Sequence, residues 1–339
     1  MRIIVAFVFL AWAPAAIAAN ISPDSLAVLA RTDSLAAILV EQPLDSKLAE
    51  LGDSLFVPSP RRAHIIRDRY GVPHIYGETD ADVAFGFGYA QAQDHLIPML
   101  LSYRGAAGRL SEVLGESALE SDTKALLWRV KGVAGERYGT IPKDTRDLIG
   151  GFVNGVNHYI DVYEEVLPEW VEAINGKEVV ALSRWLMLLF AETTGAPELA
   201  KKGLEPTLKW GVGSNQWAIG GSKSATGSPV FVMDLHLPWE IPFQLYEAHL
   251  ISREGLNVTG ATFFGLPVIA VGHNEQIAWS MTLNDTDVFD LFEEKLDQAN
   301  SRRYVYEREN ERMTTNRIKI KVRKGDSSYE VERELLYTH

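Results

Sequence analysis

The 339-residue sequence contains no cysteine. This absence excludes disulfide bonds, thiolate metal sites and a cysteine nucleophile. Basic residues are also few, with 33 Lys and Arg against 45 Asp and Glu, which gives a formal net charge of −12. A nucleic-acid partner would favour a basic stripe, so this charge balance argues against one and predicts a protein that anionic surfaces repel.

Long apolar runs are scarce as well, and none is long enough to predict a membrane span. The first 19 residues instead resemble a secretory signal peptide: a basic Arg2, an apolar run from Ile3 to Trp12, and a small-residue cleavage site at Ala16-Ile17-Ala18. An amino-terminal anchor is the alternative, but the run is shorter than the roughly 20 residues of a spanning helix. We therefore expect a periplasmic or secreted protein.

The remaining sequence divides by pattern into two parts, which predicts an α+β protein. The content of hydrophobic residues is 46%, enough for a large core. Helical spacing dominates residues 20–195, although residues 63–68 alternate as a strand and the acidic run 116–122 is typical of a solvated loop. Residues 196–213 have the Gly, Pro and Lys content of a linker, and residues 214–339 follow strand patterns.

The junction of these two parts, Gly213-Ser214-Asn215-Gln216-Trp217, contains a candidate nucleophile. If the Gly213–Ser214 bond is cut, Ser214 carries a hydroxyl nucleophile and a free α-amine that can act as its base. Such an amine has a pKa of about 7.7–8.0, so part of it is neutral near pH 7. The alternative interpretation is a turn that leads into a strand, and the motif alone does not exclude it.

Several blocks in the sequence favour the first interpretation. They are Asp68-Arg69-Tyr70-Gly71-Val72-Pro73-His74-Ile75, Gly88-Tyr89-Ala90-Gln91-Ala92-Gln93-Asp94, Ser214 to Gly221, Met233 to Leu237, Gly272-His273-Asn274 and Ile277-Ala278-Trp279. In order and spacing they resemble the penicillin acylase family of N-terminal-nucleophile (Ntn) hydrolases. The resemblance runs from about Arg61 to the last residue and covers the family's α chain, spacer and first part of the β chain. It implies a four-layer αββα sandwich, incomplete in this chain, and an α/β heterodimer after self-cleavage.

The resemblance also assigns roles to residues around Ser214. It implies cleavage between Gly213 and Ser214, an orienting role for His236 beside the new amine, and an oxyanion-stabilising backbone N–H at Leu283. Leu237 and Phe264 match positions in the family's acyl pocket. The family's second oxyanion donor would lie beyond His339, and Leu235 stands where many relatives have proline, which puts the local turn in doubt.

A calcium site is implied by the same alignment. Its ligands would be Glu198 from the α chain and, from the β chain, Asp287, the Phe289 carbonyl and Asp290. Such oxygen ligands suit one structural calcium ion, and the spacing excludes an EF-hand. A solvated acidic loop is the alternative interpretation.

The predicted activity is hydrolysis of the amide of a hydrophobic acyl group. Penicillin-type, cephalosporin-type and acyl-homoserine-lactone substrates all remain open, which includes roles in antibiotic chemistry and quorum quenching. Two other hypotheses remain: a truncated, non-catalytic acylase remnant, and an exported binding protein without chemistry.

Overall fold

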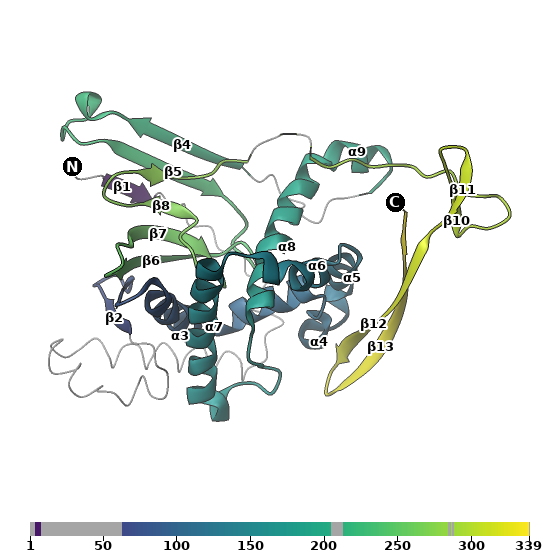
Figure 1. Cartoon of the computed structure of the whole chain (residues 1–339), viewed down its shortest axis with the longest axis horizontal. Helices are drawn as coiled ribbons and strands as arrows, with labels where there is room; N and C mark the ends of the chain where they lie inside the picture. The colour runs from purple at the N-terminus through teal and green to yellow at the C-terminus, as the bar shows by residue number, and fades with distance from the viewer. Residues whose placement is uncertain (1–3, 8–62, 205–212, 284–285, 287, 339) are drawn as a thin grey trace. The chain divides into compact units, whose positions relative to one another are not determined.

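The computed structural model describes residues 4–7, 63–204, 213–283, 286 and 288–338 (Figure 1). Most of the predicted signal peptide, the helical lead-in before residue 63 and residues 205–212 lie outside the described residues. The chain forms two compact units. The first comprises Met1–Tyr103, Glu136–Val180 and Val212–Leu283, and the second comprises Arg104–Gly135, Ala181–Gly211 and Asn284–His339. Each unit therefore combines residues from before and after Ser214.

A six-stranded sheet forms the centre of the first unit, in the order β2-β3-β6-β7-β8-β9 (Figure 1). The strands are β2 (Ala63–Arg67), β3 (Pro73–Gly77), β6 (Leu245–Ser252), β7 (Asn257–Phe263), β8 (Val271–His273) and β9 (Ala278–Trp279). Neighbouring strands are antiparallel except β3 and β6, which are parallel. Strand β6 alternates between half-buried and buried residues, as a period of two requires when one face is more covered. The strand predicted for residues 63–68 is confirmed.

Two long helices cover one side of this sheet, α3 (Asp80–Ala107) and α7 (Lys143–Tyr163). They contact through glycines, because a Cβ at Gly155 would lie 1.9 Å from the Phe85 carbonyl oxygen and one at Gly88 would lie 2.1 Å from that of Phe152. Helix α3 lies equally close to the sheet, where a Cβ at Gly86 would meet Ile75 at 2.7 Å. The unit also contains η3 (Tyr138–Thr140), η4 (Glu164–Val166) and the start of α8 (Gly176–Thr194). Glycine at these positions fixes how closely the helices pack.

A second sheet, in the order β1-β5-β4, contacts the first. It contains β1 (Ile4–Phe7), β5 (Val230–His236) and β4 (Gly213–Ile219), with η5 (Gly221–Lys223) between the last two. Met233, with only 2% of its surface exposed, packs against Ala261 and Val271 of the six-stranded sheet, and Phe231, Leu235 and Leu245 extend this contact. The described part of this unit thus has helices on one sheet and a second sheet on the other side. Residues 4–7, which fall in the predicted signal peptide, pair in parallel with β5.

The second unit consists of short helices and two β-hairpins. Its elements are α4 (Ser111–Leu114), η2 (Gly115–Ala118), α5 (Leu119–Leu127), α6 (Val130–Arg137, which extends into the first unit), most of α8, α9 (Ala196–Lys201), β10 (Arg303–Tyr306), β11 (Glu309–Arg312), β12 (Thr314–Lys324) and β13 (Ser327–Tyr337). Residues 196–201 of the predicted linker form the helix α9. The strand pattern predicted for residues 214–339 is confirmed in its last part by β10 to β13.

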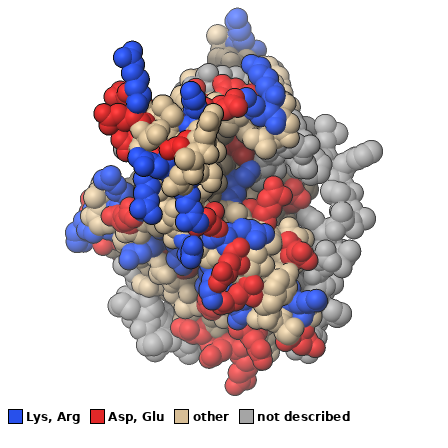
Figure 2. Space-filling view, turned by 90° about the vertical axis from the view of Figure 1, so that its right-hand side faces the viewer, with Lys and Arg blue, Asp and Glu red and all other residues tan. Residues whose placement is uncertain are grey.

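The charged residues of β12 are all basic, and those of β13 are mainly acidic. Lys319 on β12 lies 2.9 Å from Glu330 and 3.8 Å from Glu332 on β13, and Arg317 lies 3.5 Å from Glu334. These pairs are exposed, so solvent screens them and each adds little to stability. Figure 2 shows basic and acidic side chains intermixed over the face that it presents. Among the described residues, no helix has the length and apolar character needed to cross a bilayer.

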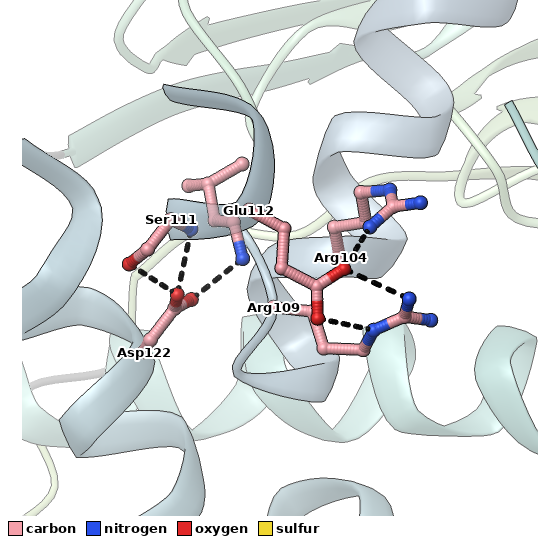
Figure 3. Close-up of polar contacts among 6 residues, drawn as sticks. Arg104, Arg109, Ser111, Glu112 and Asp122 are labelled. Carbon is pink, nitrogen blue, oxygen red and sulfur yellow. Dashed lines mark hydrogen bonds and ion pairs between the residues drawn. The ribbon is translucent and has the colours of Figure 1, made fainter. Parts of the chain in front are cut away.

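The acidic run 116–122 differs from its prediction as a solvated loop. It forms η2 and the start of α5, and Asp122 is completely buried (Figure 3). The Asp122 carboxylate accepts hydrogen bonds from the backbone N–H of Leu110 at 2.8 Å and from the N–H and hydroxyl of Ser111 at 2.7 and 2.5 Å. Burial raises the pKa of Asp122 despite these three donors. One carboxylate of this acidic run is thus buried, and it fixes the backbone at the start of α4 through these hydrogen bonds.

Replacement of Asp122 by alanine should destabilise the protein, because two buried N–H groups and a hydroxyl would lose their acceptor. We expect a loss of about 2–4 kcal/mol in the free energy of unfolding, measured by urea denaturation. Glu120→Ala, an exposed position on the same helix, is the matched control and should stay within about 0.5 kcal/mol of the parent. Equal effects of the two substitutions would contradict a structural role for Asp122.

Candidate active site at Ser214

Ser214 is the second residue of strand β4 and is half-buried. Its hydroxyl lies 2.5 Å from the carbonyl oxygen of Gly213 and donates a hydrogen bond to it. The side chain that would cleave the Gly213–Ser214 bond therefore lies against the carbonyl group of that bond. All five residues from Gly213 to Trp217 lie within β4, and a turn that leads into this strand would fall in residues 205–212, outside the described residues.

The register of β4 and β5 decides which way the Ser214 hydroxyl points. Ser214 pairs with Leu235 and Gln216 pairs with Met233. Residues opposite one another in an antiparallel pair share a face of the sheet. Since Leu235 and Met233 contact the six-stranded sheet, Ser214 belongs to the inner face, between the two sheets.

His236 occupies the other face. It is the last residue of β5, and it pairs with Gly213. Its Nε2 lies 2.9 Å from a carboxylate oxygen of Asp234 and 3.3 Å from Nδ2 of Asn215, and its side chain is 49% exposed. Among the described residues, no hydrogen bond links His236 to Ser214. A contact between His236 and the freed amine of Ser214 stays a prediction.

Leu283 lies in the irregular segment after β9 and is half-buried. Its backbone N–H has no hydrogen-bond partner among the residues that the structure describes. This is the condition that an oxyanion donor must meet, because a donor that is already bonded cannot bind a developing charge. Leu237, directly after β5, is also half-buried.

Phe264 lies at the end of β7 in a turn that α3 holds. The buried Gln91 of α3 accepts from the Gly265 N–H at 2.8 Å and donates to the Leu266 carbonyl at 3.1 Å. Tyr103, also from α3, donates to the Gly265 carbonyl at 2.6 Å. Burial raises the pKa of this tyrosine well above its usual value. The sequence did not predict a role for Gln91 or Tyr103. For Gln91, the available signal was a polar residue on the apolar face of α3.

A kink in α3 brings a histidine against Phe264. His95 has non-helical backbone angles, φ −144° and ψ 36°, three residues before Pro98. Proline cannot donate to the carbonyl four residues earlier and its ring clashes with that carbonyl, which is the usual cause of such a kink. The His95 ring stacks on Phe264 with centroids 4.4 Å apart, and Tyr246 contacts both rings. Phe264 is only 6% exposed and is held in place from two sides.

The predicted metal ligands lie within the second unit. Glu198 on α9 accepts a hydrogen bond from the Leu291 N–H at 2.8 Å. Gly195 lies against the Phe289 ring, since a Cβ there would lie 2.0 Å from the ring. These contacts bring Glu198 to the stretch that contains Phe289 and the exposed Asp290. Asp287 lies outside the described residues, and the described residues contain no group of three or more His, Asp or Glu arranged to hold a metal ion.

Comparison with known proteins supports the resemblance noted in the sequence. The family model for penicillin amidase matches residues 62–339. The chain therefore belongs to the penicillin amidase family, and the predicted resemblance is confirmed.

Two curated relatives in sequence agree with this assignment. The chain is 28% identical over 311 residues to an acyl-homoserine lactone acylase, PvdQ, of Pseudomonas fluorescens, covering 81% of this chain and 40% of that protein. It is 28% identical over 322 residues to the aculeacin-A acylase of Actinoplanes utahensis, covering 80% of this chain and 41% of that protein. A thermostable penicillin G acylase structure from Alcaligenes faecalis matches 43% of this chain and 88% of that chain, with 22% identity and a TM-score of 0.35. The chain thus spans about 40% of the length of these curated acylases.

Replacement of Gln91 by alanine should destabilise the turn that carries Phe264. The substitution removes a buried acceptor of the Gly265 N–H and leaves a small cavity, for which we expect a loss of about 2–4 kcal/mol in urea denaturation. Gln276→Ala, at an exposed site, is the matched control and should have little effect. A Gln91 variant as stable as the control would show that the two hydrogen bonds do not hold the turn.

Proposed function

We propose that the chain is the precursor part of an amidohydrolase that cleaves itself at Gly213–Ser214 and then uses Ser214 as an N-terminal nucleophile. The observation that carries this proposal is the position of the Ser214 hydroxyl, against the carbonyl of Gly213 and on the inner face between two sheets. Membership of the penicillin amidase family supports it independently.

Self-cleavage would proceed through an ester. The Ser214 Oγ attacks the Gly213 carbonyl carbon, the amide C–N bond breaks, and the nitrogen takes a proton to become the free amine of Ser214. Water then hydrolyses the ester between Gly213 and the Ser214 hydroxyl, which releases the Gly213 carboxylate. Gly213 suits the strained intermediate because it has no Cβ.

Turnover would repeat the same chemistry on an external amide. The neutral amine of Ser214 takes the hydroxyl proton, and the oxygen attacks the substrate carbonyl carbon. The amide C–N bond breaks as the Ser214 ammonium returns the proton to the leaving nitrogen, and water then hydrolyses the acyl-enzyme ester to release the acid. The N–H of Leu283, which has no partner among the described residues, would stabilise the oxyanion, and Leu237 and Phe264 would contact the acyl group. We propose a hydrophobic acyl group because these two side chains are apolar; the acylase relatives favour an acyl amide such as an acyl-homoserine lactone or a penicillin.

The remaining features of the family are proposals of the same kind. Trp217 and Ile219, on the outer face of β4, are 54% and 42% exposed, as expected if a further helical layer completes an αββα sandwich. Cleavage would produce an α/β heterodimer. The signal-like first 19 residues favour export to the periplasm or beyond.

We also propose one structural calcium ion, held by Glu198, Asp287, the Phe289 carbonyl and Asp290. The residues that the structure describes fit in part, since Glu198 lies beside the 289–291 stretch and its donors are the hard oxygens that calcium prefers. The ion would tie this stretch to α9 and has no role in the proton transfers.

Self-cleavage is tested by intact mass and amino-terminal sequencing of the purified protein. We expect a fragment that begins at Ser214 in the parent and in Ser222→Ala, an exposed serine on η5 that serves as matched control. Ser214→Ala should remain uncut because it lacks the nucleophile. An uncut parent, or a Ser214→Ala chain cut at the same bond, would contradict the proposed function.

Calcium binding is tested by thermal unfolding with and without a chelator. At a calcium concentration about 100 times the dissociation constant, the ion should add about 2.7 kcal/mol, so chelation should lower the Tm of the parent. Glu198→Gln can still accept from the Leu291 N–H but lacks the charge, so its Tm should respond less. Glu294→Gln, an exposed control nearby, should respond like the parent. A parent Tm that ignores the chelator would rule out the site.

A further inference from the structure

Two histidines join strands β3 and β6 of the six-stranded sheet. His74 pairs with His249 across the parallel ladder, and their Nδ1 atoms lie 3.0 Å apart. The rings meet edge to face with centroids 5.1 Å apart. Among the described strands, β2 pairs only with β3, and the β3–β6 ladder joins this hairpin to the rest of the sheet. The histidine pair is therefore a side-chain contact that fastens the β2–β3 hairpin.

The neighbours of His249 determine which nitrogen carries its proton. The Asn257 Nδ2 donates to the Glu275 carboxylate at 2.5 Å, which turns the Asn257 Oδ1 toward His249. That oxygen lies 2.8 Å from the His249 Nε2 and can only accept, so Nε2 carries the hydrogen. In neutral His249 the Nδ1 is then an acceptor, and His74 must donate to it from its own Nδ1.

One added proton leaves the bond between the rings intact. His74 can carry it at Nε2, which lies 3.9 Å from Asp68, while its Nδ1 still donates to His249; if the shared proton moves across, the Nδ1 of His249 donates to the Nδ1 of His74 instead. With both rings protonated, each Nδ1 carries a hydrogen, and these two donors face each other at 3.0 Å. Protonation of both rings therefore requires them to separate.

We infer that the His74–His249 pair is an acid-sensitive latch that holds the β2–β3 hairpin on the sheet at neutral pH and releases it when both rings are protonated. The inference goes beyond the proposed function and does not depend on it. If the chain is cut before Ser214, β3 and β6 belong to different chains, and the same latch would link the two products.

The surroundings of the pair oppose protonation of His249 in the folded protein. Burial lowers the pKa of His249, and His74 and His273 lower it further, although the bond to Asn257 opposes them. His273 is on β8, two strands from His249. On the carboxylate side are Asp68 beside His74, Glu275 behind Asn257, and Glu247 on β6, whose pKa is raised by burial and by Asp68.

The sign of the pH effect follows from the lowered pKa. Between the folded pKa of His249 and its unfolded value of about 6.5, the unfolded chain binds more protons than the folded one. Stability should therefore fall as the pH falls below about 6.5, and the loss should be complete below the folded pKa. The loss should concentrate in β2 and β3.

Hydrogen exchange of the intact, uncut Ser214→Ala chain tests the latch without reference to catalysis. After correction for intrinsic rates, we expect protection of the β2–β3 amides to fall about fivefold more than that of β7 between about pH 7 and pH 5. In His249→Gln, and in His74→Gln if the first variant folds poorly, this extra loss should disappear.

His64→Gln is the matched control, since His64 is an exposed histidine on β2. It should keep the pH response of the parent. The inference is overturned if His249→Gln and His74→Gln retain the extra loss, if His64→Gln removes it, or if the parent loses protection equally in all strands. Failure of self-cleavage would leave this result unchanged, so the two proposals fail separately.

Discussion

Across the β4–β5 ladder, Ser214 faces Leu235, and this pairing is the constraint on which the proposed site depends. Leu235 and Met233 pack against the six-stranded sheet, so the register is fixed by burial of apolar side chains. With β5 held by these contacts, a slip of β4 by one residue would turn the Ser214 hydroxyl to the outer face. The apolar contact between the sheets thus decides both the stability of the pair and the direction of the nucleophile.

Helix α3 also acts on the proposed site, because it holds Phe264 and the turn at Gly265 in place. Its glycines permit backbone contact with α7, and Pro98 forces the kink that places His95 on Phe264. Gln91 and Tyr103 then satisfy the buried backbone groups of the adjacent turn. A predicted substrate-contact residue is therefore held by a helix that precedes it by more than 150 residues in the sequence.

The sequence predicted the elements whose signal is local. The 63–68 strand, the helical character of the described part of residues 20–195 and the strands after Ser214 follow periodicity and turn residues, and they are confirmed. Asp122 was misjudged because nothing in an acidic run shows which carboxylate will meet the N–H groups before α4. The opposite faces of Ser214 and His236 could not be predicted either, because they follow from a register set by long-range packing.

Disulfide trapping tests this register most directly, because the chain has no cysteine of its own. Trp217 pairs with Val232, whereas Phe231 points to the other face. The register predicts that a Trp217→Cys and Val232→Cys double variant forms a disulfide under mild oxidation and that a Trp217→Cys and Phe231→Cys variant does not. The reverse result would place the Ser214 hydroxyl on the outer face and contradict the proposed site.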